Sequence, residues 1–475
     1  MIKALIWKLM ERFGVQGVQF VLQILLARLL DSELYGVLSL MIVFTTLANV
    51  FIQNGFNTAL IQNKEVKEED YSSVFWVSLL IAVVLYGAIF AAAPLIARLY
   101  EMPTIVAPLR VLAIMLIPGA LNSVQLAKVS REMDFKKVFT GNIAGIVVAG
   151  VAGIAIAMMG GGLWALVAQT LLNVTVACVV MSFTVKLKIR FVCDLKRVGM
   201  LFSYGWKLLV SSLLDTLYQD ARSLVIGLKY DSSTLGYYNR GKQFPQFIIG
   251  SINGAVQSVM LPAMSRMQDD IAQAKTIMRS SITLSAYIIF PMMAGLAGVA
   301  EPMVKLLLTD KWLPCVPYLQ IYCFTLALYP VHSCNLQTIN AMGRSDIFLK
   351  LEIFKKGIGL AMLAVAVFLF DSPIAIAATG AITAIIASGI NASPNKKLIG
   401  YSYAEQLRDL LPALGLSLAM MVCVLAVGRI QLPVIVTLIV QIITGVAVYV
   451  LLSWIFRVPA FKAVLGIINK KRGKA

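Results

Sequence analysis

Long apolar runs separated by short polar gaps fill most of the chain and leave few folds open to it. The runs lie at about residues 12–30, 36–61, 72–98, 105–127, 138–159, 163–185, 201–228, 235–260, 277–300, 317–342, 347–370, 373–394, 408–428 and 433–456. A helix needs about 20 apolar residues to cross the roughly 30 Å core of a bilayer. Because 59% of the residues are apolar and 13% are charged, a soluble fold could not bury this surface. The sequence predicts an all-α membrane protein with 14 transmembrane helices.

The net charge of +18 could suggest a nucleic-acid partner, but the basic residues do not gather on a polar domain. They lie in the gaps between apolar runs. When the gaps are assigned alternately to two sides, 28 Lys and Arg residues fall on one side. The other side holds only Arg28, Arg98, Lys229, Lys305, Lys311 and Arg429. Since cytoplasmic loops are enriched in Lys and Arg, we expect a multi-pass protein with both termini cytoplasmic and no nucleic-acid partner.

A short turn occurs twice, 200 residues apart. LARLLDSELYG at 26–36 and IGLKYDSSTLGYY at 226–238 both follow an apolar run and share an Asp-Ser pair before a Gly. We expect Asp-Ser to cap a helix and the Gly to help the chain reverse. Further echoes pair Asn54-Gly55 with Asn253-Gly254, Glu69-Asp70 with Asp269-Asp270, and APLIARL at 93–99 with EPMVKLL at 301–307.

These echoes predict an internal repeat. We expect six-helix bundles at 1–190 and 191–400, followed by two extra transmembrane helices and a basic cytoplasmic tail at 401–475. Because six is even, both bundles enter the membrane from the same side and form parallel repeats. Two such bundles around a central cavity are typical of a transporter that works by alternating access.

Seven basic residues fall inside the apolar runs: Arg110, Lys207, Arg222, Arg240, Lys242, Lys355 and Lys356. Basic groups at membrane depth are costly and usually face a bundle interior or a water-filled cavity. At about 100° per residue, Lys207, Asp215 and Arg222 share one face with Tyr218. We therefore predict that the seven bind an anionic head group.

Uncharged polar residues form similar stripes on the first two predicted helices. Gln16, Gln19 and Gln23 share one face of the first helix, and Asn49 and Gln53 share one face of the second. With Tyr218, these residues complete the predicted substrate-binding set, because their amide and hydroxyl groups suit a hydroxyl-rich ligand.

The same residues also have structural interpretations. Lys207, Arg240 and Lys242 lie near helix ends and could extend to the membrane interface. Glu352 lies three and four residues before Lys355 and Lys356, so a local ion pair is an alternative to ligand binding. Three acids within the runs, Asp215, Asp220 and Glu352, could bind a coupling proton or Na⁺ or pair with nearby cations.

Six fragments together resemble the polysaccharide transporter family. They are ARLLDSELYG at 27–36, NGFNTALIQNKEVKEEDYSS at 54–73, SREMDFKKV at 130–138, GGGLWALVAQ at 161–170, LGYYNRGKQFP at 235–245 and LPAMSRMQDD at 261–270. This family contains the flippases for lipid-linked oligosaccharides, O-antigen and colanic-acid-type polymers within the multidrug/oligosaccharidyl-lipid/polysaccharide exporter superfamily. The resemblance covers about residues 1–400.

The resemblance implies a flippase, not an enzyme, in a bacterial inner membrane. Its substrate would be an oligosaccharide on undecaprenyl pyrophosphate, moved to the outer leaflet for exopolysaccharide, capsule or O-antigen synthesis. The protein partners that it implies are the polysaccharide polymerase and the export machinery. No cofactor is expected, and a coupling proton or Na⁺ is left open.

Three other classes are open to this sequence. One, a membrane scaffold for the assembly machinery, would not need charges along a central stripe. A drug antiporter of the same superfamily would take cationic substrates, which favour an acidic cavity over one lined by seven basic residues. A membrane-embedded polymerase or glycosyltransferase commonly needs a large outer loop or a carboxylate pair at a membrane face. The gaps between the runs are short here, which disfavours that class.

Overall fold

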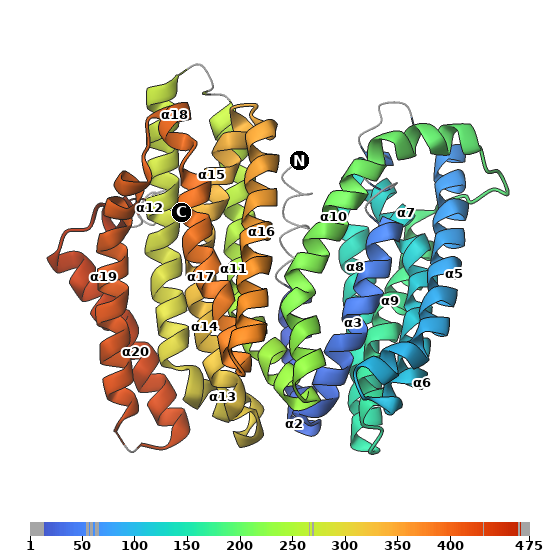
Figure 1. Ribbon diagram of the computed structural model, residues 1–475, viewed down its shortest axis with the longest axis horizontal. Coiled ribbons are helices and arrows are strands. Elements are labelled where there is room, and N and C mark those ends of the chain that lie inside the picture. Colours follow the sequence, from blue (N-terminus) through green and yellow to red (C-terminus); the bar gives the residue numbers. More distant parts are fainter. Residues whose placement is uncertain are drawn as a thin grey trace. The chain divides into compact units, whose positions relative to one another are not determined.

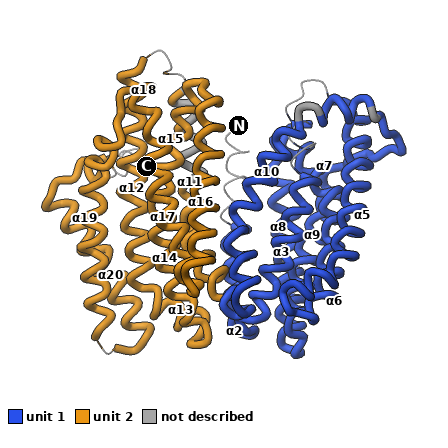
Figure 2. Tube along the Cα trace, in the orientation of Figure 1, with its two compact units in different colours: residues 1–236 blue, residues 237–475 orange. Residues whose placement is uncertain are grey.

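The computed structural model describes residues 14–53, 57, 60–61, 66–265, 267, 270–430, 432–463 and 466 (Figure 1). These residues form helices and no strand. Some residues that support the predicted charge pattern and repeat lie outside the described residues. They are Lys3, Lys8, Arg12, Lys64, Asp269, Asn54-Gly55 and the end of the basic tail. The chain forms two compact units, residues 1–236 and 237–475 (Figure 2).

Unit 1 is a helical bundle. Its elements are α2 (Gln16–Leu29), α3 (Ser32–Gln53), α5 (Glu68–Leu99), η2 (Pro103–Ile105), α6 (Val106–Leu112), η3 (Ala113–Met115), α7 (Leu116–Glu132), α8 (Phe135–Met158), α9 (Leu163–Val185) and α10 (Leu195–Lys229). The first residues of α11 (Ser232–Ser265) also belong to unit 1. Within unit 1, α10 packs against α3 and α5, and α8 packs along α9.

Unit 2 contains the rest of α11 and the helices that follow. They are α12 (Ile271–Gly298), α13 (Ala300–Leu308), η4 (Asp310–Cys315), α14 (Val316–Ala327), α15 (Tyr329–Ala341), α16 (Ser345–Leu369), α17 (Pro373–Ala392), α18 (Asn395–Ile399), α19 (Tyr403–Gly428) and α20 (Val434–Ile455). In this unit α12 packs along α19, which packs against α20.

The helices follow the apolar runs of the sequence. A helix or a series of consecutive helices covers each predicted run within the described residues. Nine helical segments of the described chain are long and apolar enough to cross a membrane. The protein is therefore an all-helical, multi-pass membrane protein.

Local sequence signals set several helix ends. The carboxylate of Asp194 accepts hydrogen bonds from the backbone N–H groups of Lys196 (3.0 Å) and Arg197 (3.2 Å), which caps α10. At the start of α19, Ser402 and Glu405 form a reciprocal capping box. These side chains satisfy N–H groups that the first turn of a helix leaves without intrahelical partners.

Candidate functional site

The predicted polar stripe of α10 runs from an exposed to a buried position. Lys207 is exposed, Asp215 and Tyr218 are half-buried, and Arg222 is only 8% exposed. At 1.5 Å per residue, Lys207 and Arg222 lie about 22 Å apart along the helix. Asp220, on another face, is half-buried. The helix therefore carries cationic groups at two well-separated positions along its length.

Arg222 lies next to an aromatic ring of its own helix. Its guanidinium carbon is 5.8 Å from the centre of the Tyr218 ring, one turn earlier. An aromatic face attracts a cation within about 6 Å, so Tyr218 orients the arginine as well as sharing its face. Sequence spacing predicted the shared face, and the structure adds this ring contact.

The glutamine and asparagine stripes of α2 and α3 lie in unit 1. Gln16, Gln19 and Gln23 are all half-buried. On α3, the side-chain amide of Gln53 donates to the Asn49 side-chain oxygen at 3.3 Å. The structure thus brings Asn49 and Gln53 together, as their four-residue spacing predicts.

Arg110 on α6 packs against α5. Its Nε donates to the backbone oxygen of Phe90 at 3.1 Å, and its guanidinium lies 4.0 Å from the Phe90 ring centre. These contacts fix the side chain between two neighbouring helices. Of the seven predicted cations, Arg110 therefore has a clear packing role in addition to its predicted ligand role.

On α16, the predicted local ion pair is present. Lys355 Nζ lies 2.5 Å from Glu352 Oε1, and both side chains are largely buried. Lys356 is half-buried beside them. Because the Glu352 carboxylate partly neutralises Lys355, this site presents less positive charge than the two lysines alone.

Arg240 and Lys242 of α11 lie in an aromatic cluster of unit 2 that the sequence did not predict. Arg240 donates to the Gln243 side chain at 2.7 Å, and its guanidinium is 5.1 Å from the Trp312 ring. Lys242 Nζ is 6.0 Å from the Tyr322 ring. Trp312 is 72 residues after Arg240 in the sequence. Helical periodicity therefore does not relate the two residues, and no local sequence pattern could predict their contact.

The repeated turn has a specific role in unit 1, and it differs from the expected one. Neither Gly36 nor Gly236 adopts a positive φ, and each lies in the first turns of a helix, α3 or α11. A Cβ on Gly36 would lie 1.7 Å from the Ser232 backbone oxygen, and a Cβ on Gly236 would lie 2.1 Å from that of Ser32. The expectation that these glycines reverse the chain is wrong, because they instead allow two backbones to touch reciprocally.

A buried amide network connects three helices of unit 2. The side chains of Asn335 (α15), Asn395 (α18) and Gln406 (α19) are 0% exposed. Asn335 donates to Gln406 Oε1 at 2.8 Å, and Asn395 donates to Asn335 Oδ1 at 2.7 Å. The sequence alone does not reveal this set, because its members are separated along the chain and share no motif.

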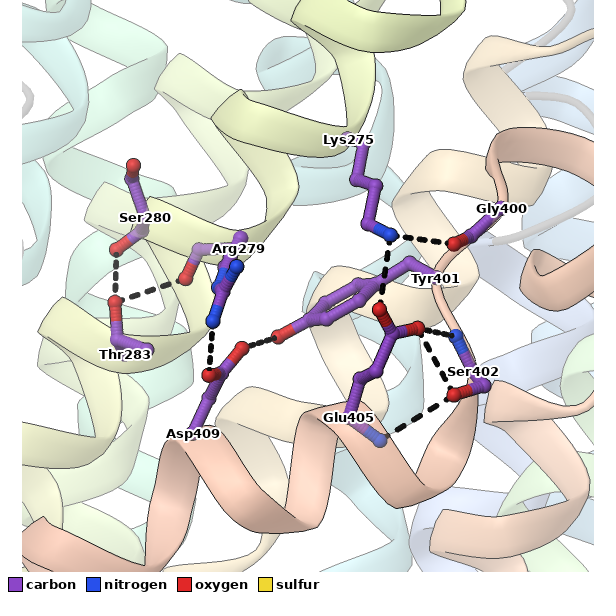
Figure 3. Close-up of polar contacts among 9 residues, drawn as sticks. All are labelled: Lys275, Arg279, Ser280, Thr283, Gly400, Tyr401, Ser402, Glu405 and Asp409. Atoms are coloured by element: carbon purple, nitrogen blue, oxygen red, sulfur yellow. Dashed lines mark hydrogen bonds and ion pairs between the residues drawn. The ribbon is translucent and has the colours of Figure 1, made fainter.

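A second polar cluster joins α12 to α19 at one end of unit 2 (Figure 3). Lys275 binds Glu405 at 3.0 Å and the Gly400 backbone oxygen at 2.6 Å. Arg279 binds Asp409 at 2.5 Å, and the same carboxylate accepts the Tyr401 hydroxyl at 2.7 Å. Both cations therefore form ion pairs with carboxylates, and the cluster attaches α19, which packs against α20, to α12.

Unit 2 also contains an apolar groove of about 510 Å³. Side chains of α12, α14, α15, α17 and α19 line it, including Phe290, Phe324, Leu410, Leu414 and Leu418. Its few polar groups include Gln320, Ser388 and Tyr403. Such a surface suits a hydrocarbon chain and not a charged head group.

Known proteins are similar to this chain in sequence and in fold. The family described as "Polysaccharide biosynthesis protein" matches residues 25–317. The succinoglycan biosynthesis transport protein ExoT of Rhizobium meliloti (strain 1021) is 24% identical over 342 residues, which cover 72% of this chain and 69% of ExoT.

Two solved structures have a similar fold. The lipid II flippase MurJ in its inward closed conformation gives a TM-score of 0.75 at 15% identity, covering 96% of this chain and 99% of MurJ. An inward-facing multidrug resistance MATE family transporter gives a TM-score of 0.64 at 15% identity, covering 82% of this chain and 98% of that transporter. At this identity the likeness concerns the fold alone.

Proposed function

Because this chain belongs to the polysaccharide biosynthesis protein family of membrane transporters, we propose that it is a flippase for undecaprenyl-pyrophosphate-linked oligosaccharides. It would move repeat units from the cytoplasmic to the outer leaflet of a bacterial inner membrane, for exopolysaccharide, capsule or O-antigen synthesis. The family match over residues 25–317 is the observation that carries the proposal.

The proposed mechanism is alternating access by two parallel six-helix repeats, residues 1–190 and 191–400. The proposed topology has 14 transmembrane helices, both termini in the cytoplasm, and residues 401–475 as two extra helices with a basic tail. The fold shared with two transporters supports an alternating-access mechanism. The repeated turns at Gly36 and Gly236 support the internal repeat.

Charge supports a phosphorylated substrate. Arg222 is buried on α10, two helical turns after the half-buried acid Asp215 on the same face. Arginine binds phosphate oxygens through several N–H groups at once, with stronger hydrogen bonds than neutral donors form. We propose that Arg222 and Lys355 contribute most to binding, that Lys207 and Lys356 assist, and that Arg110, Arg240 and Lys242 contribute least because packing contacts engage them.

The sugar and the lipid chain call for different surfaces. The amide groups of Gln16, Gln19, Gln23, Asn49 and Gln53 are suitable partners for sugar hydroxyls. The apolar groove of unit 2 is a suitable surface for part of the isoprenoid chain. We further propose that Asp215, Asp220 or Glu352 binds a coupling proton or Na⁺, and that the polymerase and export machinery receive the product.

An in vivo test uses a bacterial strain that lacks its own flippase and expresses this chain. We expect restored surface polymer with the wild-type chain. The Arg222→Ala/Lys355→Ala variant should instead accumulate lipid-linked repeat units facing the cytoplasm. Full export by this double variant would remove the proposed binding site and leave the family assignment intact.

A drug antiporter is the second candidate, because a multidrug resistance transporter shares the fold. A cationic drug would be repelled by the positive charges on α10 and α16, and the family match names polysaccharide biosynthesis. Increased resistance to cationic dyes in cells that express the chain, without restored polymer, would favour this candidate instead.

A further inference from the structure

Residues 186–191 connect α9 to α10, and we call them the basic strap. Lys186 ends α9 in the left-handed conformation (φ 48°), and residues 187–190 follow it outside any helix. Successive side chains of an extended chain point to opposite sides. Lys186, Lys188 and Arg190 are exposed, whereas Leu187 packs against a buried cluster that contains Tyr71. The strap therefore presents Lys188 and Arg190 on one side, about 7 Å apart along the chain, and the exposed Lys186 lies just before them.

Helix α5 fixes the backbone of the strap. Ser72 Oγ accepts the Arg190 N–H at 3.0 Å, and Trp76 Nε1 donates to the Arg190 oxygen at 2.9 Å. Ser73 Oγ accepts the N–H of Asp194, just beyond the strap, at 3.0 Å. Because Ser72 and Ser73 are 0% and 1% exposed, the two serine contacts are largely shielded from water. The spacing of the cations is thus fixed before any ligand binds.

The cations of the strap differ from several other basic residues of the chain, which have acidic partners. Arg197 binds Asp70 at 2.8 Å, Lys137 binds Asp134 at 3.1 Å, and Arg279 binds Asp409 at 2.5 Å. Among the residues that the structure describes, no carboxylate forms an ion pair with Lys186, Lys188 or Arg190. Their charge is therefore available to an external anion.

An exposed aromatic side chain lies at the end of the strap. Phe191 is 93% exposed, and its ring stacks on that of Trp76 with the ring centres 5.0 Å apart. Val192 beside it is 41% exposed. Aromatic residues next to Lys and Arg are typical of protein surfaces at the boundary between lipid head groups and acyl chains. This combination indicates a lipid ligand and not a dissolved anion.

We propose that the basic strap binds the phosphate head groups of anionic phospholipids, with Phe191 contacting the upper acyl chains. Neighbouring cations on one side of an extended chain can contact one head group together. The proposal uses one part of the proposed function, namely the topology that places the strap at the cytoplasmic surface of the membrane. Its test is a binding measurement that involves no transport.

The test uses the purified full-length protein in detergent, titrated with phosphatidylglycerol, phosphatidylcholine or inorganic phosphate and followed by native mass spectrometry. A Lys188→Gln/Arg190→Gln variant should need roughly tenfold more phosphatidylglycerol for half-saturation, since each Lys or Arg near a membrane surface contributes to attraction of anionic lipid. Lys188→Arg should bind like wild type because it keeps the charge.

The matched control is Lys396→Gln/Lys397→Gln, which removes the same charge from the exposed residues of α18. These adjacent residues point about 100° apart on a helix and cannot share one head group in the same way. The proposal is overturned if both double variants lose phosphatidylglycerol equally, if phosphatidylcholine binds the wild type as well, or if inorganic phosphate displaces the lipid. Equal thermal unfolding of both variants in phosphatidylcholine would show that folding is unchanged.

Discussion

The helical pairs α2–α3 and α10–α11 have the same turn but different chemistry. The N–H of Leu30 bonds to the Leu26 oxygen at 2.9 Å, and 200 residues later the N–H of Tyr230 bonds to the Ile226 oxygen at 2.9 Å. The next helices start at Ser32 and Ser232. Yet the described part of α2 carries glutamines on its polar face, whereas α10 carries Lys207, Asp215 and Arg222.

This difference distinguishes residues that packing of the backbone requires from residues whose chemistry suits a ligand. The turns are alike because each contributes a glycine to the same reciprocal contact. The polar faces of α2 and α10 can differ because no such backbone contact constrains their side chains. This difference agrees with a structural role for the turns and with the anion-binding role that we propose for α10.

The largest effect is expected from Gly36→Ala. Its Cβ would overlap the Ser232 backbone oxygen, which cannot move away as a flexible side chain could. We expect destabilisation of about 1–3 kcal/mol or more, with loss of export, measured by thermal unfolding and by complementation of a flippase-deficient strain. Gly236→Ala should act alike, which tests the equivalence of the turns.

Gly87→Ala on α5 is the matched control for Gly36→Ala. No atom beyond its own helix backbone and its chain neighbours lies within 4 Å of a Cβ at this position. The substitution should be neutral or slightly stabilising, since alanine favours a helix over glycine. If Gly36→Ala behaved like Gly87→Ala, the reciprocal contact would not matter for folding or transport.

Arg222→Gln should give the next largest effect. A hydrogen bond to a charged group contributes about 1.5–3 kcal/mol, so we expect a roughly tenfold or greater loss of flipping with near-normal folding. Arg222→Lys should recover part of the activity because it keeps the charge and loses the planar geometry. Arg98→Gln, on the exposed end of α5, is the control that should leave flipping unchanged.

A smaller effect is expected from Lys355→Gln, because Glu352 already neutralises part of its charge. Flipping should fall about threefold, against tenfold or more for Arg222→Gln. Glu352→Gln should restore a positive site and raise apparent substrate affinity. Equal losses from Glu352→Gln and Lys355→Gln would instead indicate that the ion pair serves folding.

The smallest effect is expected from Gln19→Ala. One neutral hydrogen bond contributes about 1 kcal/mol, and Gln16 and Gln23 on the same face can compensate. We expect at most a fivefold rise in the substrate concentration for half-maximal flipping, with the maximal rate unchanged. A loss as large as that of Arg222→Gln would show that α2 and α10 have the same role after all.

The sequence predicted what depends on composition and local spacing. Apolar runs located the helices, and the three-residue spacing of Glu352 and Lys355 predicted their ion pair. It could not predict contacts between distant segments. Trp312 beside Arg240 and the reciprocal approach of Gly36 and Gly236 depend on how the helices pack. The glycines were detected by their repetition, but their role required the fold.

The most direct test of the account measures flipping of one pyrophosphate-linked glycan by purified protein in liposomes. A glycosidase outside the vesicles reports the arrival of fluorescent glycans that start in the inner leaflet. We predict that wild-type protein speeds this arrival far above that in empty liposomes, and that Arg222→Gln removes most of the gain. Arrival no faster than in empty liposomes, or equal arrival with both proteins, would contradict the account.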